Sequence, residues 1–254
     1  MRATYDVPRH PPDPTLSMRL NKYISDTGYC SRREADRLVT ERRVTVNGLP
    51  AGVGAQLAEG DRVEVDGQPL AVRTAKPGAR RHVYIALNKP VGITCTTDAT
   101  VKGNIVDFVG HQQRIFPIGR LDKDSEGLIL LTSNGDIVNE ILRVENHKEK
   151  EYLVGVNLPV SDEFLRGMAR GVRIHSETTL PCKTRKIARF GFSIVLTQGL
   201  NRQIRLMAAA FGYRVTQLRR IRIANVKLAE IKPGRWRNLT QAELHGLLPG
   251  RTEW

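Results

Sequence analysis

The sequence predicts an α+β protein with a small N-terminal domain and a larger domain behind it. Its 254 residues suffice for one large domain plus a small one. After residue 82, short apolar runs mix with amphipathic helical segments without a regular βαβ repeat, which favours α+β over a doubly wound sheet. Residues 71–81 carry Pro, Gly and basic side chains but no apolar period, as is typical of a basic linker.

These features place the domain boundaries. Residues 1–17 contain four prolines and no apolar core, which predicts a disordered leader and excludes a secretory signal. The first domain then spans 18–75, the linker 76–81 and the second domain 82–254.

The first domain is expected to begin with helices and to continue in short strands. Ser31 and Glu34 have the spacing of a capping box at the start of a helix that runs to about Arg42. Residues 44–46 and 62–65 resemble strands, each followed by a type I′ turn dipeptide, Asn-Gly or Asp-Gly.

In the second domain some apolar segments have the spacing of strands and others have the spacing of helices. We predict strands at 83–88, 127–132, 150–156, 182–188, 191–197 and 214–223. We predict helices at 136–143, 161–170, 201–211 and 240–247, the last with a capping box from Thr240 to Glu243.

Charge indicates a polyanionic partner. The chain carries 40 Lys+Arg against 26 Asp+Glu, a net charge of +14. Residues 181–237 hold 14 basic residues and one acid. This concentration favours nucleic acid over an acidic protein or a membrane surface.

Several classes of site are not expected. Three cysteines without a Cys-x-x-Cys pair argue against disulfides and a zinc ribbon, and favour a reducing, cytoplasmic compartment. No P-loop, dinucleotide fingerprint or metal-ligand cluster is present, so neither a cofactor nor a metal is predicted. No apolar stretch is long enough to span a membrane, and without a heptad seam we expect a monomer.

The segment 119–127 is the candidate for chemistry. Its alternating acids resemble a calcium loop, but with Asp122 as the first position the twelfth is Ser133, where the ion needs a bidentate Glu. A plain polar turn stays open as an alternative. Against it, Asp122 lies between two cations, Arg120 and Lys123, beside an apolar strand, which favours an ionised, poised carboxylate.

Two resemblances add to these observations. Residues 18–24, 30–36 and 44–48 resemble the S4 RNA-binding domain, whose arginine-bearing helix face lies on RNA. The motif Gly-Arg-Leu-Asp at 119–122 resembles that of pseudouridine synthases, in the branch that carries an S4 domain and acts on ribosomal RNA. Residues 86–92, 150–152 and 199–205 match further motifs of that family in order, and details resemble the 23S rRNA pseudouridine synthase F type.

The resemblance implies a catalytic domain with a mixed, mainly antiparallel sheet that isomerises uridine to pseudouridine in 23S rRNA or its precursor particle, with a tRNA anticodon-loop uridine as a further candidate. It implies that Asp122 is the essential carboxylate, that Arg205 pairs with it, and that Tyr152 stacks on the uracil. Arg120 would fill the space left by the flipped base. The remaining RNA-binding candidates are Arg19, Lys22, Arg32, Arg33, Arg37, Lys89, Asn201 and Arg202.

One alternative lies outside enzymes. A non-enzymatic S4-type assembly factor would also bind RNA through its positive charge. The long segment after the linker argues against it, because mere anchoring does not require such a segment.

Overall fold

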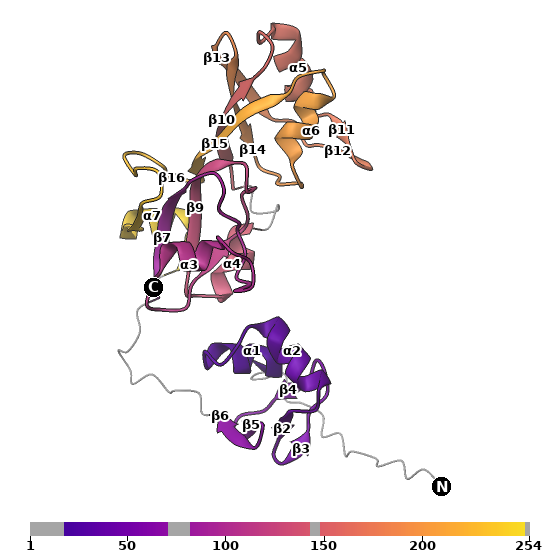
Figure 1. The fold of residues 1–254 in the computed structure, drawn as a ribbon, viewed down its shortest axis with the longest axis vertical. Helices are drawn as coiled ribbons and strands as arrows, with labels where there is room; N and C mark the ends of the chain where they lie inside the picture. Colours follow the sequence, from indigo (N-terminus) through magenta and orange to yellow (C-terminus); the bar gives the residue numbers. More distant parts are fainter. Residues whose placement is uncertain (1–17, 71–81, 143–147, 252–254) are drawn as a thin grey trace. The chain divides into compact units, whose positions relative to one another are not determined.

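Figure 1 shows the computed structural model of the chain, which describes residues 18–70, 82–142 and 148–251. The chain divides into two compact units between Arg80 and Arg81. The predicted leader at 1–17 and linker at 76–81 lie outside the described residues, so they stay predictions.

The N-terminal unit is a helix pair beside a small sheet (Figure 1). Its sheet has the order β3-β2-β5-β6 and is antiparallel throughout, and β1 pairs separately with β4. Both helices contribute apolar side chains to one core with the strands. The elements are β1 (Met18–Arg19), α1 (Leu20–Asp26), α2 (Arg32–Thr40), β2 (Val44–Val46), β3 (Leu49–Pro50), β4 (Gln56–Leu57), β5 (Val63–Val65) and β6 (Gln68–Leu70).

Local predictions for this unit are confirmed in most details. Both residues of the Asn-Gly turn at 47–48 and of the Asp-Gly turn at 66–67 have positive φ, as type I′ turns require. The Ser31 side chain accepts from the Glu34 N–H at 3.1 Å. The other half of the predicted capping box is wrong, because the Glu34 carboxylate accepts from Arg37 instead. Helix α2 also stops earlier than predicted, since Arg42 has φ +58°.

The C-terminal unit is built on a nine-stranded mixed sheet. Its main path is β13-β14-β10-β15-β9-β7-β17, with β16 on β15 and β8 on β9. Only the β9–β15 pair is parallel among these described strands. The elements of its first half are β7 (Tyr84–Lys89), α3 (Ile105–Val109), β8 (Phe116–Ile118), β9 (Glu126–Thr132) and α4 (Asp136–Leu142). Those of its second half are β10 (Lys150–Val156), α5 (Asp162–Arg170), β11 (Arg173–Ile174), β12 (Glu177–Thr178), β13 (Lys183–Ala188), β14 (Gly191–Leu196), α6 (Gln203–Ala209), β15 (Val215–Ile223), β16 (Val226–Lys227), β17 (Trp236–Asn238) and α7 (Gln241–Leu247).

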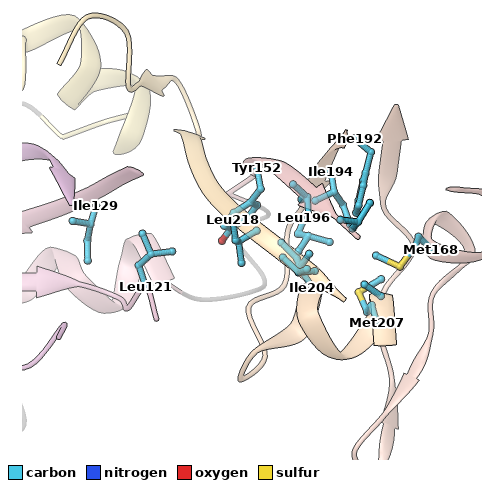
Figure 2. Close-up of a cluster of buried hydrophobic side chains, with 14 of the residues drawn as sticks. Leu121, Ile129, Tyr152, Met168, Phe192, Ile194, Leu196, Ile204, Met207 and Leu218 are labelled. Atoms are coloured by element: carbon cyan, nitrogen blue, oxygen red, sulfur yellow. The ribbon is translucent and has the colours of Figure 1, made fainter. Parts of the chain in front are cut away.

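Apolar cores lie on both faces of this sheet. On strand β7, Ile85 and Leu87 face one core, which α3, α5 and α6 help to form. Tyr84 and Ala86 face the other core, with α4 and α7. Figure 2 shows part of the first core, where side chains from β10, β14, β15 and α6 gather. Because β7 and β9 are buried on both faces, they form a rigid base for the loop that precedes β9.

The α+β class and the mixed, mainly antiparallel sheet are therefore confirmed. The six strands and four helices predicted for this unit are all present, with ends shifted by up to two residues. Helix α3 was not predicted, because its five residues are too few to show a helical period.

Candidate active site

The loop between β8 and β9 carries Asp122 and is held in a tight turn. The Ser125 N–H donates to the Asp122 carbonyl oxygen at 3.0 Å, and Ser125 is fully buried. A second segment braces the loop, since the Gly92 N–H donates to the Lys123 carbonyl oxygen at 2.8 Å. The Asp122 side chain, 32% exposed, thus stands on a fixed backbone while it stays accessible.

A glycine behind this loop lets two strands approach closely. Gly127 has φ +104° and pairs with Arg220 of β15 in the parallel ladder. A Cβ atom at this position would lie 2.2 Å from the Arg220 carbonyl oxygen, whereas Cβ atoms in proteins essentially never lie within 3.0 Å of such a backbone atom. The loop and β15 can therefore meet only because residue 127 has no side chain.

Arg220 is a buried cation that joins this loop to β10 and was not predicted. It is 5% exposed, and its Nε donates to the Leu128 carbonyl oxygen at 2.6 Å. Its Nη1 lies 3.4 Å from the Arg120 carbonyl oxygen and 3.5 Å from the Tyr152 hydroxyl. The guanidinium carbon is 5.9 Å from the centre of the Tyr152 ring, within cation–π range.

Tyr152 lies opposite Arg220 across the β10–β15 pair. Its side chain is buried, and Figure 2 shows it near Leu218 in the middle of the labelled residues of the apolar cluster. The ring is therefore held by apolar packing while its hydroxyl faces Arg220.

The expected ion pair between Arg205 and Asp122 is wrong. The Arg205 Nη2 donates to the Asp124 carbonyl oxygen at 3.1 Å and to Ser125 Oγ at 3.2 Å, and lies 3.4 Å from the Asp124 carboxylate. The guanidinium nearer to Asp122 belongs to Arg202, whose Nη1 is 4.0 Å from Asp122 Oδ2. Arg205 lies on helix α6, and its hydrogen bonds to Asp124 and Ser125 brace the loop without reaching the Asp122 carboxylate.

Asp124 is the acid that these arginines hold most closely. Burial raises the pKa of the Asp124 carboxyl, but the hydrogen bond from Arg202 and the charge of Arg205 outweigh it, so this pKa lies below its ordinary value. Asp124 therefore stays ionised and ties helix α6 to the loop.

Lys89 was predicted to contact RNA, and the structure contradicts this. It is fully buried at the end of β7, where it pairs with Gly127 beneath the loop. Its Nζ donates to the carbonyl oxygens of Pro90 at 2.8 Å and Ile93 at 3.0 Å. Burial lowers the pKa of Lys89, while the charges of Asp122 and Asp124 act in the opposite direction.

A cavity of about 460 Å³ opens in front of the loop, a volume in the usual range for ligand sites. It brings together five of the predicted site residues and leaves Arg205 and Lys89 outside its lining. Its floor is apolar, with Leu130, Leu218 and Ile223 among its members. The predicted residues in its lining are Arg120, Asp122, Tyr152, Asn201 and Arg202.

Two basic residues of the cavity lining were missed by sequence reasoning, Lys150 and Arg220. The alternation along β15 could have indicated Arg220, because it shares a strand face with buried Leu218. Lys150 and Tyr152 likewise share one face of β10. The sequence motif drew attention to the tyrosine alone.

The predicted RNA-binding side chains of the N-terminal unit lie at its surface. Arg19, Arg32 and Arg33 are exposed, and Arg32 donates to the Asn21 side chain at 3.2 Å. Lys22 pairs with Asp26 at 2.8 Å, and Arg37 pairs with Glu34 on the same helix. Three arginines of α2 therefore remain accessible to a polyanion, which is what the prediction requires.

The described residues contain no group of three or more His, Cys, Asp or Glu side chains that could hold a metal ion. No helix in the described ranges is long and apolar enough to cross a membrane.

Two family models match the chain. The model described as RNA pseudouridylate synthase matches residues 83–210, and the S4 domain model matches residues 18–63. One match therefore lies in each of the two units.

Named relatives and a solved structure agree with them. The chain is 57% identical over 228 residues to the "Dual-specificity RNA pseudouridine synthase RluF" of Salmonella typhi, covering 90% of this chain and 78% of the relative. It is 35% identical to the "Ribosomal large subunit pseudouridine synthase B" of Bacillus subtilis, covering 90% and 95%. A crystal structure of a pseudouridylate synthase superposes with a TM-score of 0.66 at 29% identity, covering 91% of this chain and all of that one.

An S4 domain is thus joined to a catalytic unit whose Gly-Arg-Leu-Asp loop faces a tyrosine across one cavity. Named synthases match almost the whole chain, and these relatives favour an enzyme over a non-enzymatic assembly factor. The chain belongs to the RNA pseudouridine synthase family, and it is an enzyme that acts on RNA.

Proposed function

We propose that this enzyme converts one specific uridine of 23S rRNA, free or in its precursor particle, into pseudouridine. The observation that carries this proposal is the cavity that Asp122 shares with Tyr152, in a chain with an S4 domain. Relatives named for dual specificity support a second substrate, for which a tRNA anticodon-loop uridine is the candidate. We further propose that it works as a monomer in the cytoplasm.

The target uridine must leave its stack to reach the cavity. Flipping costs about a few kcal/mol, which RNA contacts elsewhere must offset. The exposed side chain of Arg120 stands at the rim, where it fills the vacated space. Asn201 and Arg202 are also exposed at this rim and meet the backbone next to the target.

Asp122 then breaks the bond between the ribose and the base by one of two routes. In the first, a carboxylate oxygen attacks C1′ and N1 leaves with the bonding electron pair. In the second, the carboxylate takes the C2′ proton, a C1′=C2′ double bond forms, and N1 again leaves with its pair. Both routes yield the same detached uracil anion, which rotates and bonds to C1′ through C5. In the first route the bond between C1′ and the Asp122 carboxylate breaks as this bond forms, and in the second the Asp122 carboxyl returns the proton to C2′.

The remaining site residues keep this reaction in place. The Tyr152 ring stacks on the uracil, and its hydroxyl lies near the position where the C5 proton must leave. Arg205 is a positioning residue in this scheme, because it holds the loop through Asp124 and Ser125. The arginines of α2 anchor the RNA through its backbone.

A pseudouridine map of rRNA and tRNA by carbodiimide labelling and primer extension tests this proposal. It is made on cells that lack the protein, complemented with wild type or with Asp122→Asn. We expect one 23S uridine to lose its label and only wild type to restore it. Restoration by Asp122→Asn would overturn the role of Asp122, and a change confined to 16S rRNA would overturn the substrate.

A further inference from the structure

The cavity holds more positive charge than the Asp122 carboxylate can balance. Among the residues that the structure describes, four basic side chains line it, Arg120, Lys150, Arg202 and Arg220, against one acid, Asp122, and of the four only Arg202 also pairs with Asp124 beside the cavity. Arg120 and Arg202 are exposed at the rim, where they suit RNA phosphates. Arg220 is buried and Lys150 is half-buried, which places them where the base enters and not where the RNA backbone passes.

Lys150 is fixed in this deeper part of the cavity. Its Nζ donates to the Thr197 carbonyl oxygen at 3.2 Å, and it lies on the same face of β10 as Tyr152. Within the described parts of the chain no carboxylate lies within ion-pair distance of it, whereas its sequence neighbours Glu149 and Glu151 both pair with Arg222.

The electrostatic surroundings of Lys150 favour an anion. Burial and the charge of Arg220 both lower the pKa of the Lys150 ammonium. An anion in the cavity would act against both effects, because it supplies the negative charge that the described side chains around Lys150 lack. Such a preorganised cation stabilises charge that develops during a reaction more than charge already present in the substrate.

The reaction creates one anion at this place. When the C1′–N1 bond breaks, its electron pair stays on the uracil and spreads from N1 onto the O2 and O4 oxygens. When C5 bonds to C1′, that pair is used again and the charge disappears. We propose that Lys150 is a further catalytic residue, which contacts the detached uracil and, with Arg220, stabilises its negative charge.

This inference rests on the proposed function, and a substrate with a better leaving group separates the two. Fluorine at C5 withdraws electrons and stabilises the uracil anion without help from the protein. We therefore compare single-turnover loss of the N1-linked nucleotide from a 23S rRNA fragment carrying uridine or 5-fluorouridine at the target. The enzymes are wild type, Lys150→Gln, which removes the charge but keeps a donor, and Lys150→Arg, which keeps the charge.

We expect Lys150→Gln to slow the uridine substrate about 100-fold at saturating enzyme, and the fluorinated substrate about tenfold or less. Lys150→Arg should recover most of the loss. Lys227→Met, which removes an exposed lysine on β16 outside the cavity, should keep the wild-type ratio between the two substrates.

Equal slowing of both substrates by Lys150→Gln would overturn the inference, because a structural defect does not distinguish them. Full activity of Lys150→Gln would overturn it as well. If Lys150→Gln fails to fold, Lys150→Arg decides: a preference for the fluorinated substrate like that of wild type supports the charge role, and an inactive but folded enzyme refutes it. Wild type that leaves the uridine substrate unchanged would instead refute the proposed function.

Discussion

Replacing Gly127 with Ala should separate the two strands between which the active-site loop is anchored. The added Cβ would lie 2.2 Å from the Arg220 carbonyl oxygen, so the strands must part by about 1 Å to reach an ordinary contact. This movement stretches the buried hydrogen bond from Arg220 to the Leu128 carbonyl oxygen, now 2.6 Å. The alanine must also adopt a φ of +104°, which favours glycine.

The two costs can be separated with a matched control. Gly212 has φ +78° and nothing within 4 Å of its Cβ position, so Gly212→Ala bears only the backbone strain, about 1–2 kcal/mol. Gly127→Ala adds a disturbed buried hydrogen bond, about 1–3 kcal/mol, and lost strand pairing. We expect its free energy of unfolding to fall at least about 2 kcal/mol further than that of Gly212→Ala.

Urea unfolding followed by tryptophan emission measures this difference. Both tryptophans, Trp236 and Trp254, follow residue 81 in sequence, so the signal reports the C-terminal unit. With a slope of about 2 kcal/mol per molar urea, the midpoint of Gly127→Ala should lie about 1 M below that of Gly212→Ala. Midpoints that agree within about 0.2 M would refute the idea that close strand approach fixes this site.

Three other perturbations test separate parts of the structure. Arg220→Met should lower the free energy of unfolding of the C-terminal unit by about 2–4 kcal/mol and remove activity, because the Leu128 carbonyl oxygen loses its buried donor. Equal midpoints of thermal unfolding for Arg220→Met and wild type would contradict this. The Arg237 guanidinium lowers the pKa of Glu243 by a hydrogen bond, so the pair stabilises the fold above the ordinary Glu pKa of about 4.3 and stops doing so as pH falls through the lower folded value. Unfolding from pH 7 to pH 3 should therefore show a smaller acid loss for Glu243→Gln than for wild type, and parallel curves would exclude the pair as a contributor. Arg33→Gln should weaken RNA binding and lower the slope of log K against log salt by about 1 if this arginine contacts a phosphate, whereas an unchanged slope would remove it from the interface.

Much of the fold could be predicted because its elements carry strong local signals. Strand β10 at 150–156 matches its predicted bounds, since a short apolar run rich in β-branched and aromatic residues is typical of a strand. The capping box from Thr240 to Glu243 is also confirmed. It could be predicted because both of its hydrogen bonds lie within four consecutive residues. Helix α3 at 105–109 and strand β17 at 236–238 were missed, because they are too short to show a period.

The site was predicted less completely, and the errors involve contacts between residues that lie far apart in the sequence. A lysine beside a proline resembles a surface residue, yet Lys89 is buried beneath Gly127 by strand pairing. The partner of Arg205 was expected to be Asp122, but the approach of helix α6 gives it Asp124. Arg220 resembles one more basic residue in a basic segment, and the parallel pairing of β9 and β15 shows that it lies against the loop.

The parallel β9–β15 contact has a consequence for the order in which the protein folds. It consists of two residue pairs, Glu126 with Arg219 and Gly127 with Arg220, which join segments far apart in the chain. Pairs between strands close in sequence, such as β13 with β14, close over short stretches and can form early. Closing the long connection between β9 and β15 costs more chain entropy, so this seam is expected to form late. Catalytic activity should then return during refolding only after most of the secondary structure has formed.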